Sequence, residues 1–184
     1  MVHITDKQLT LEEFLALPDG DVTYELVNGV AIPKVSPKFF HSTVQRNLLF
    51  LLDSWCEDKG RVVPEWAITL KRHGKDWVPV PDLTYISFDR LPAEWVEDEA
   101  CPVAPELAIE IISPGQTFGE MVEKAINYLE AGVQRVWVID TQAKNLTVFY
   151  PDAPPQTYTG EMLLADSLFP GLQLTAQAIL PSQK

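Results

Sequence analysis

The sequence predicts a single α/β domain in which helices pack on a central sheet. Two apolar runs, residues 106–112 and 133–139, are suited to buried strands, and residues 118–131 between them have the apolar spacing of an amphipathic helix. Strand, helix and strand in succession imply a right-handed crossover and a parallel strand pair. The chain has 184 residues without an internal repeat or long linker, so residues 5–180 are taken as one unit.

The N-terminal part predicts a short helix and a β-hairpin. Thr10-Leu11-Glu12-Glu13 has the form of a capping box and predicts a helix over residues 11–17. Asn28-Gly29 predicts a tight turn between strands over residues 22–27 and 30–33.

A longer helix and two strands are predicted next. Residues 37–59 carry apolar side chains at helical spacing, and residues 61–70 form a strand pattern. Residues 77–87 predict the partner strand, in which Pro79 and Pro81 confine the first half to an edge, a bulge or a strand start.

The remaining segments are a loop and β additions. Residues 89–104 are polar and predict a loop, residues 145–150 predict a hairpin strand, and residues 151–184 predict short strands and turns. The predicted order is therefore helix, three strands, helix and strand, with additions at both ends.

The charge of the chain limits how it can contact nucleic acid. With 26 acidic and 14 basic residues, the net charge is -12, and such a surface repels polyanions at long range. Contact with DNA would need a bound metal, an oligomer surface or a local basic patch. Lys71, Arg72, His73 and Lys75 are the candidate patch, or simply a soluble hairpin tip. A homodimer would gather scarce basic residues around one groove.

Other features predict a cytoplasmic protein. No apolar run approaches the ~18 residues of a membrane span, and residues 1–7 lack the order of a signal peptide. Cys56 and Cys101 lack metal-ligand spacing, which favours buried thiols in a reducing compartment.

Two acids are the main candidates for chemistry. Asp82 stands at the mouth of a predicted strand, and Glu110 lies within an apolar run. An unpaired charge costs several kcal/mol to bury, so Glu110 needs a cation, a donor or a metal. Magnesium takes oxygen ligands, which suits two carboxylates from adjacent strands. Alternatively, both acids are structural and bond to backbone groups or to Arg135.

Lys124 is the candidate cation. It lies in the early turns of the helix after Glu110, on the flank between Met121 and Tyr128, from where its stem could reach the end of the strand. The alternative is a solvated lysine paired with Glu120. Two acids holding a metal, with an ammonium that orients or activates water, predict phosphodiester hydrolysis.

The same residues carry a family resemblance. The motifs are Pro81-Asp82, Glu110-Ile111-Ile112-Ser113-Pro114, Lys124, Tyr128, Gly132-Val133 and Val136-Trp137-Val138-Ile139-Asp140. With them the chain resembles the Uma-two-type restriction endonucleases of the PD-(D/E)XK nuclease superfamily. The resemblance implies a restriction endonuclease-like core with an N-terminal helix and hairpin and C-terminal β additions. It also implies an endonuclease that cuts DNA with Mg²⁺ or Mn²⁺.

The resemblance also assigns roles to residues. Asp82 would be the motif aspartate and Glu110 the second acid, both binding metal. The superfamily's lysine two residues after the second acid is replaced by Ile112, so Lys124 would supply the ammonium from the next helix. Glu25 matches an early glutamate of the family and would bind metal or hold a neighbouring group. Its alternative is a solvent-facing acid on a hairpin strand.

Three further polar residues are expected at the surface or in a turn. His41, one turn before Gln45 on the same helix face, is expected at the surface, with phosphate contact as the alternative. Glu106 is expected to be solvated at a strand start, and Ser113 to cap a turn or bind phosphate.

Two functions remain open from the sequence. One is a magnesium-dependent endonuclease acting on DNA. The other is a catalytically inactive nuclease-fold module for binding or assembly, favoured by the pI of about 4.6, the missing strand lysine and Trp95.

Overall fold

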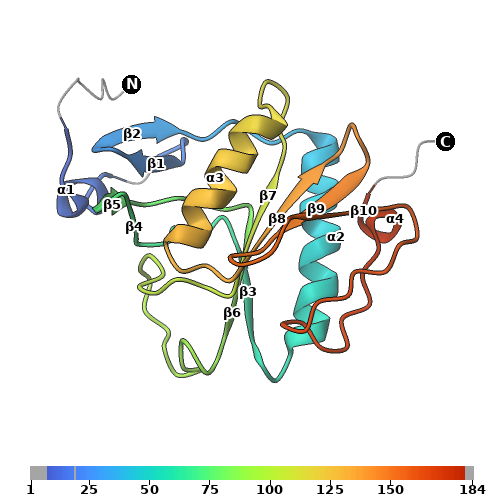
Figure 1. The fold of residues 1–184 in the computed structure, drawn as a ribbon. Coiled ribbons are helices and arrows are strands. Elements are labelled where there is room, and N and C mark those ends of the chain that lie inside the picture. The colour runs from blue at the N-terminus through green and yellow to red at the C-terminus, as the bar shows by residue number, and fades with distance from the viewer. Residues whose placement is uncertain (1–7, 19, 181–184) are drawn as a thin grey trace.

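The computed structural model describes residues 8–18 and 20–180, so the predicted domain start at residue 5 lies outside the described residues. The elements, in chain order (Figure 1), are α1 (Leu11–Leu15), β1 (Tyr24–Val27), β2 (Val30–Pro33), α2 (Phe39–Cys56), β3 (Gly60–Pro64), β4 (Leu70–Arg72), β5 (Lys75–Trp77), β6 (Leu83–Ser87), β7 (Leu107–Ile111), α3 (Phe118–Glu130), β8 (Arg135–Asp140), β9 (Asn145–Phe149), β10 (Gln156–Thr159) and α4 (Ala176–Ile179).

A six-stranded mixed sheet forms the centre, in the order β10-β9-β8-β7-β6-β3. The pair β7 and β8 is parallel, and α3 connects them, as the strand-helix-strand pattern predicted. The other neighbours in this sheet are antiparallel. The predicted succession of helix, three strands, helix and strand therefore exists as α2, β3, β6, β7, α3 and β8.

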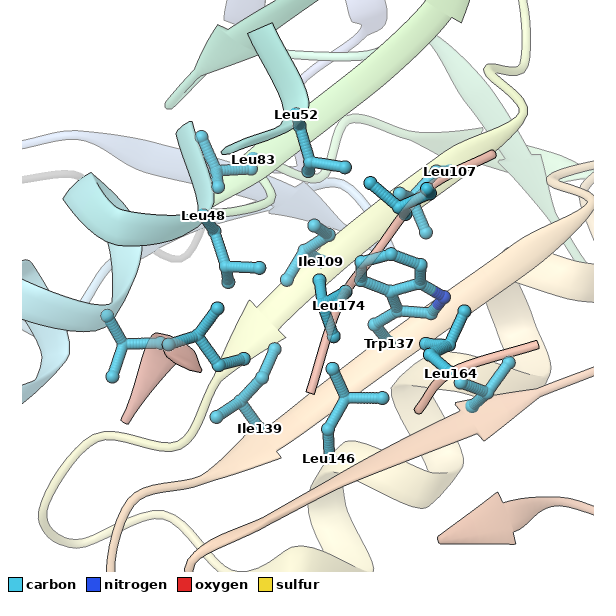
Figure 2. Packing of buried hydrophobic residues seen from close by; sticks show 14 of the residues in the cluster. Leu48, Leu52, Leu83, Leu107, Ile109, Trp137, Ile139, Leu146, Leu164 and Leu174 are labelled. Carbon is cyan, nitrogen blue, oxygen red and sulfur yellow. The ribbon is translucent and has the colours of Figure 1, made fainter. Parts of the chain in front are cut away.

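The two faces of the sheet carry different helices. The side chains of Leu107 and Ile109 on β7 pack with α2, α4 and the C-terminal segment, around the buried Trp137 (Figure 2). Ala108 packs on the opposite face, with α3. Because side chains alternate along a strand, Glu110 lies on the α3 face. This alternation directs the acid toward α3.

The β1–β2 hairpin docks beside the sheet (Figure 1). Asn28 and Gly29 both have positive φ, at 52° and 79°, as the Asn-Gly turn predicted. Leu26 and Val78 exchange two backbone hydrogen bonds of 3.0 Å, which attach the hairpin to the segment between β5 and β6. A small apolar cluster beneath it includes Phe14 of α1.

The two long strands predicted for residues 61–70 and 77–87 are wrong as single elements. In the first, Glu65 has a positive φ of 51°, which separates β3 from β4. In the second, the segment with Pro79 and Pro81 separates β5 from β6, since proline lacks the N–H that a ladder needs. The β4–β5 pair forms its own sheet, and Asp82 directly precedes β6.

The predicted helices run slightly beyond the observed ones. α1 ends at Leu15 and α2 runs from Phe39 to Cys56, and the residues that follow each helix form turns. Across the described ranges, the structure contains no helix with the length and apolar character to cross a bilayer.

Candidate active site

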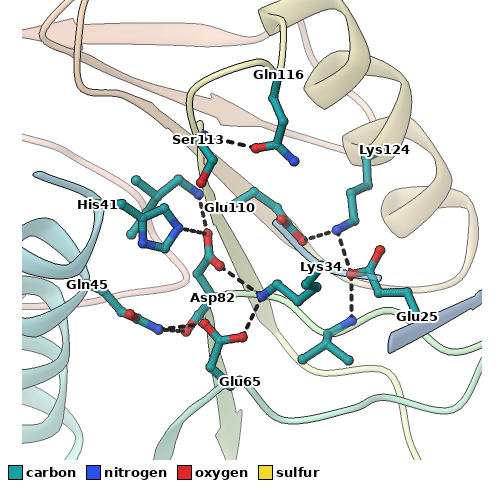
Figure 3. Close-up of polar contacts among 12 residues, drawn as sticks. Glu25, Lys34, His41, Gln45, Glu65, Asp82, Glu110, Ser113, Gln116 and Lys124 are labelled. Atoms are coloured by element: carbon teal, nitrogen blue, oxygen red, sulfur yellow. Dashed lines mark hydrogen bonds and ion pairs between the residues drawn. The ribbon is translucent and has the colours of Figure 1, made fainter. Parts of the chain in front are cut away.

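The structure brings together the three residues predicted to carry chemistry (Figure 3). Asp82 directly precedes β6, Glu110 lies on β7 and Lys124 lies on α3. Lys124 Nζ lies 2.9 Å from Glu110 Oε1. The amphipathic pattern of α3 explains this contact, because Met121 and Tyr128 are buried against the sheet and Lys124 lies on the flank between them.

Asp82 is held in one orientation by groups on three sides. Its Oδ2 accepts a 2.7 Å hydrogen bond from the Ile111 N–H and lies 3.0 Å from His41 Nε2, while Lys34 Nζ lies 3.0 Å from Oδ1. Burial alone would raise the pKa of Asp82, but the hydrogen bond with His41 and the charge of Lys34 lower it below its usual value. Asp82 is therefore a fixed carboxylate.

Glu110 has a different protonation equilibrium. Its Oε1 accepts a 2.7 Å hydrogen bond from the Tyr128 hydroxyl. Burial raises the pKa of Glu110 to about 7, because the charges of Asp82 and Glu25 add to the burial and the Lys124 ammonium only partly offsets it. The two acids thus differ in the pH at which they ionise, a property common in catalytic pairs.

Lys124 is an ion-paired cation. Burial would lower its pKa, but the carboxylates of Glu110 and Glu25 raise it above the usual value. The alternative of a solvated lysine paired with Glu120 is therefore wrong. Glu120 instead completes a capping box with Thr117 at the start of α3.

Glu25 also belongs to the cluster. Its Oε1 accepts hydrogen bonds from the Val80 N–H, at 2.9 Å, and from Lys124 Nζ, at 2.8 Å. The side chain is only 14% exposed, so the alternative of a solvent-facing acid is wrong. In this arrangement Glu25 positions Lys124, and its role as a metal ligand stays a prediction.

Lys34 and Glu65 are cluster residues that sequence reasoning missed. Lys34 Nζ lies 2.5 Å from Glu65 Oε2, and Gln45 Nε2 donates to Glu65 Oε1 and to the Asp82 carbonyl at 3.0 and 2.9 Å. The position of Gln45 one turn after His41, on the same helix face, could have indicated that Gln45 contacts the cluster. Lys34 offered none, because a lysine after a hairpin strand is ordinarily solvated.

Two expectations about polar residues are wrong. His41, in the first turn of α2, is buried and contacts Asp82, since α2 packs on one face of the sheet. Glu106 is buried and accepts hydrogen bonds from the Ser87 N–H and hydroxyl. The Ser113 N–H donates to Gln116 Oε1 and the Ser113 carbonyl accepts from the Gln116 N–H, and the role of the Ser113 hydroxyl stays a prediction.

Other polar residues form ion pairs away from the two acids. Arg135 pairs with Asp166, so the alternative in which it bonds Asp82 or Glu110 is wrong. In the predicted basic patch, Arg72 pairs with Glu123 on α3, which occupies part of that surface.

The donors of the cluster fit a hard divalent cation. Four carboxylates, of Asp82, Glu110, Glu25 and Glu65, surround two ammonium groups, so the fully ionised cluster carries two excess negative charges. Among the described residues, no group of three or more His, Cys, Asp or Glu is placed to hold a metal together. Magnesium commonly takes one or two carboxylates and keeps several waters, which suits Asp82 and Glu110.

Comparisons with known proteins identify the fold and the family of the chain. The crystal structure of a putative nuclease belonging to DUF820 from Anabaena variabilis ATCC 29413 is similar, with a TM-score of 0.81 and 26% identity over 93% of this chain and 97% of that one. No curated protein matches the chain. The Uma2 family model, described as a putative restriction endonuclease, matches residues 11–177. The chain therefore belongs to the Uma2 family of putative restriction endonucleases, with a restriction endonuclease-like core.

Proposed function

We propose that this protein is an endonuclease that hydrolyses DNA phosphodiester bonds with Mg²⁺ or Mn²⁺. Asp82 and Glu110 would hold the cation, and Lys124 would assist the attacking water. The observation that carries the proposal is the convergence of these three side chains, with Lys124 Nζ 2.9 Å from Glu110. Membership of a putative nuclease family supports the same reaction class.

The side chains divide the chemical work. A divalent cation, when bound, supplies Lewis acidity to a phosphodiester. Lys124 is kept protonated by Glu110 and Glu25, so it offers N–H donors to a water and offsets negative charge that develops on phosphate. Glu25 accepts a hydrogen bond from Lys124 and so holds the lysine in place, and the Tyr128 hydroxyl donates to Glu110 and fixes that carboxylate.

A calorimetric titration tests the cation site. Mg²⁺ and Mn²⁺ are titrated into the native chain, Asp82→Ala and Glu110→Ala, with Asp58→Ala as the control because Asp58 is an exposed acid beyond the far end of α2. We expect binding to be lost in both site variants and kept in the control. A native chain that binds neither ion, even with oligonucleotide present, would favour the inactive binding module.

A cleavage assay tests the reaction itself. Native chain and Lys124→Met are incubated with supercoiled plasmid and Mn²⁺, and nicked products are counted over time. We expect Lys124→Met to lower kcat by about 10²-fold or more, the scale of losing one positioned charge-stabilising donor. Full activity in this variant would remove Lys124 from the mechanism.

A further inference from the structure

A second pocket adjoins the acid cluster. It has a volume of about 340 Å³, within the range of small-ligand sites, and lies where β7, β8 and the start of α2 meet. His41 lines both this pocket and the neighbouring polar pocket that contains Lys34 and Asp82. A molecule in the aromatic pocket, named here for its phenylalanines, would therefore lie one side chain away from Asp82.

Three phenylalanine rings give this pocket its character. Phe39 and Phe40 open α2 and are 76% and 48% exposed, and Phe118 opens α3 and is 41% exposed. The rings of Phe39 and Phe40 are tilted by 58° with centroids 5.8 Å apart. Neither ring belongs to a core cluster of the described residues. Such exposed π-faces are suited to a flat aromatic ligand.

The rest of the wall carries amide and carboxylate groups. Gln116 accepts from the Ser113 N–H through its Oε1, so its amide N–H groups remain available within the described part of the chain. Asp140 accepts from two backbone N–H groups through Oδ1. Its Oδ2 therefore also remains available within the described part of the chain. Carboxylate and amide side chains of this kind read the edges of bases, whereas a carboxylate repels phosphate.

The charge of the whole chain adds an independent argument. At -12 the chain cannot gain much binding energy from counterion release along a duplex. Stacking of bases on aromatic side chains does not depend on charge, and it requires bases whose faces are not already stacked on one another.

We infer, on the basis of the proposed nuclease function, that the substrate is DNA with unpaired bases, and that the aromatic pocket receives one unstacked base beside the cleavage site. Phe39 and Phe40 stack on the base, and Gln116 and Asp140 face its edge. The next phosphate along the strand then lies toward His41 and the acid cluster.

Fluorescence anisotropy without divalent ions tests this inference independently of cleavage. A labelled single-stranded 12-mer and the matching duplex are titrated with the native chain, Phe39→Ala/Phe40→Ala, and Phe50→Ala. Phe50 is the control because it is 70% exposed on the same helix and does not line the aromatic pocket.

We expect the single strand to bind more tightly than the duplex, and the double variant to weaken it about 5- to 150-fold per stacked base lost. Phe50→Ala should bind like the native chain. A duplex bound as tightly as the single strand, or equal losses in both variants, would overturn the inference. So would preferred binding of an RNA 12-mer, or a dimer that the double variant dissociates in light scattering, which would assign the pocket to a second copy.

Cleavage with Mn²⁺ separates the two proposals. Cleavage of duplex and single strand at equal rates would contradict the pocket inference and leave the nuclease function standing. Single-strand binding that depends on Phe39 and Phe40, without cleavage of any DNA, would contradict the nuclease function and leave a single-strand-binding module.

Discussion

At the residue scale, Glu110 is an acid whose charge near neutral pH depends on its surroundings. It lies in a fully apolar stretch of β7, yet it faces Lys124, Tyr128 and other acids. Its pKa of about 7 lies above the ordinary value because burial disfavours the carboxylate more than the lysine favours it.

The raised pKa predicts a stability difference between the metal-free native chain and Glu110→Gln. A carboxyl whose pKa is higher folded than unfolded makes stability fall as pH rises between the two values, here from about 4.5 to about 7. Relative to Glu110→Gln, the native chain should lose on the order of 1 kcal/mol of unfolding free energy per pH unit in this window. Urea unfolding at pH 5, 6 and 7 measures it. A constant difference would contradict the shifted pKa.

Lys34 competes for the carboxylate proposed to bind the cation. Its ammonium lies 3.0 Å from Asp82, and the charges of Asp82, Glu110 and Glu65 raise its pKa above the usual value despite burial. Lys34→Met should therefore tighten Mg²⁺ binding about tenfold, since removing a part-buried positive charge makes the cluster more negative.

Calorimetry of Lys34→Met, with the exposed Lys75→Met as the control, measures this change. Weaker Mg²⁺ binding in Lys34→Met than in the control would instead give Lys34 a supporting role at the metal site.

The sequence predicted only part of the cluster at this scale. Asp82, Glu110 and Lys124 could be predicted, because each is anomalous or well placed within its own element. Lys34 could not, because its partner Asp82 is 48 residues away and nothing local marks the contact. The burial of His41 follows from how the first turn of α2 packs beside Asp82, which helical periodicity does not specify.

At the element scale, the β1–β2 hairpin is a structural support for the site. Glu25 lies on β1, and Lys34 follows β2, with its backbone N–H bonded to the Thr23 carbonyl. Both side chains reach the acid cluster, so the geometry of the turn that joins the strands affects the positions of two charges.

Gly29→Ala should disturb the site through this hairpin. Gly29 has a φ of +79°, and an added Cβ would lie 3.2 Å from Gln8 Cβ, so we expect a loss of about 1–2 kcal/mol of stability and weaker Mn²⁺ binding. Gly74→Ala is the matched control, since Gly74 has a φ of +76° in the β4–β5 turn with open space around it. Melting curves and calorimetry compare them. Equal effects on Mn²⁺ binding would contradict a special role of the hairpin.

The same scale explains which elements the sequence predicted well. Helices and buried strands were found because their apolar periodicity is strong, as in α3 and β7. The two long strand predictions failed because residues 61–70 and 77–87 each pass from one sheet to another, at Glu65 in the first and at the segment with Pro79 and Pro81 in the second. Hydrophobic alternation detects an extended chain, and it does not identify the partner strand.

At the scale of the whole molecule, the acidic surface determines how DNA can bind. With a net charge of -12 and few basic side chains near the acid cluster, the number of phosphates neutralised at once must be small. We therefore predict that the logarithm of the DNA association constant falls with the logarithm of salt concentration with a slope of about −2 or shallower. Anisotropy titrations across a range of potassium chloride concentrations measure the slope. A value near −6 would reveal an extended basic interface.

The attachment of the hairpin by the Leu26–Val78 bridge has a consequence for motion. Segments held by few backbone hydrogen bonds are often the first to open. If β1–β2 lifted away, Glu25 and Lys34 would leave together, one anion with one cation. Because these two charges cancel, the net charge of the remaining acid cluster would stay the same. Through these two side chains the hairpin thus adds contacts to the acid cluster and no net charge.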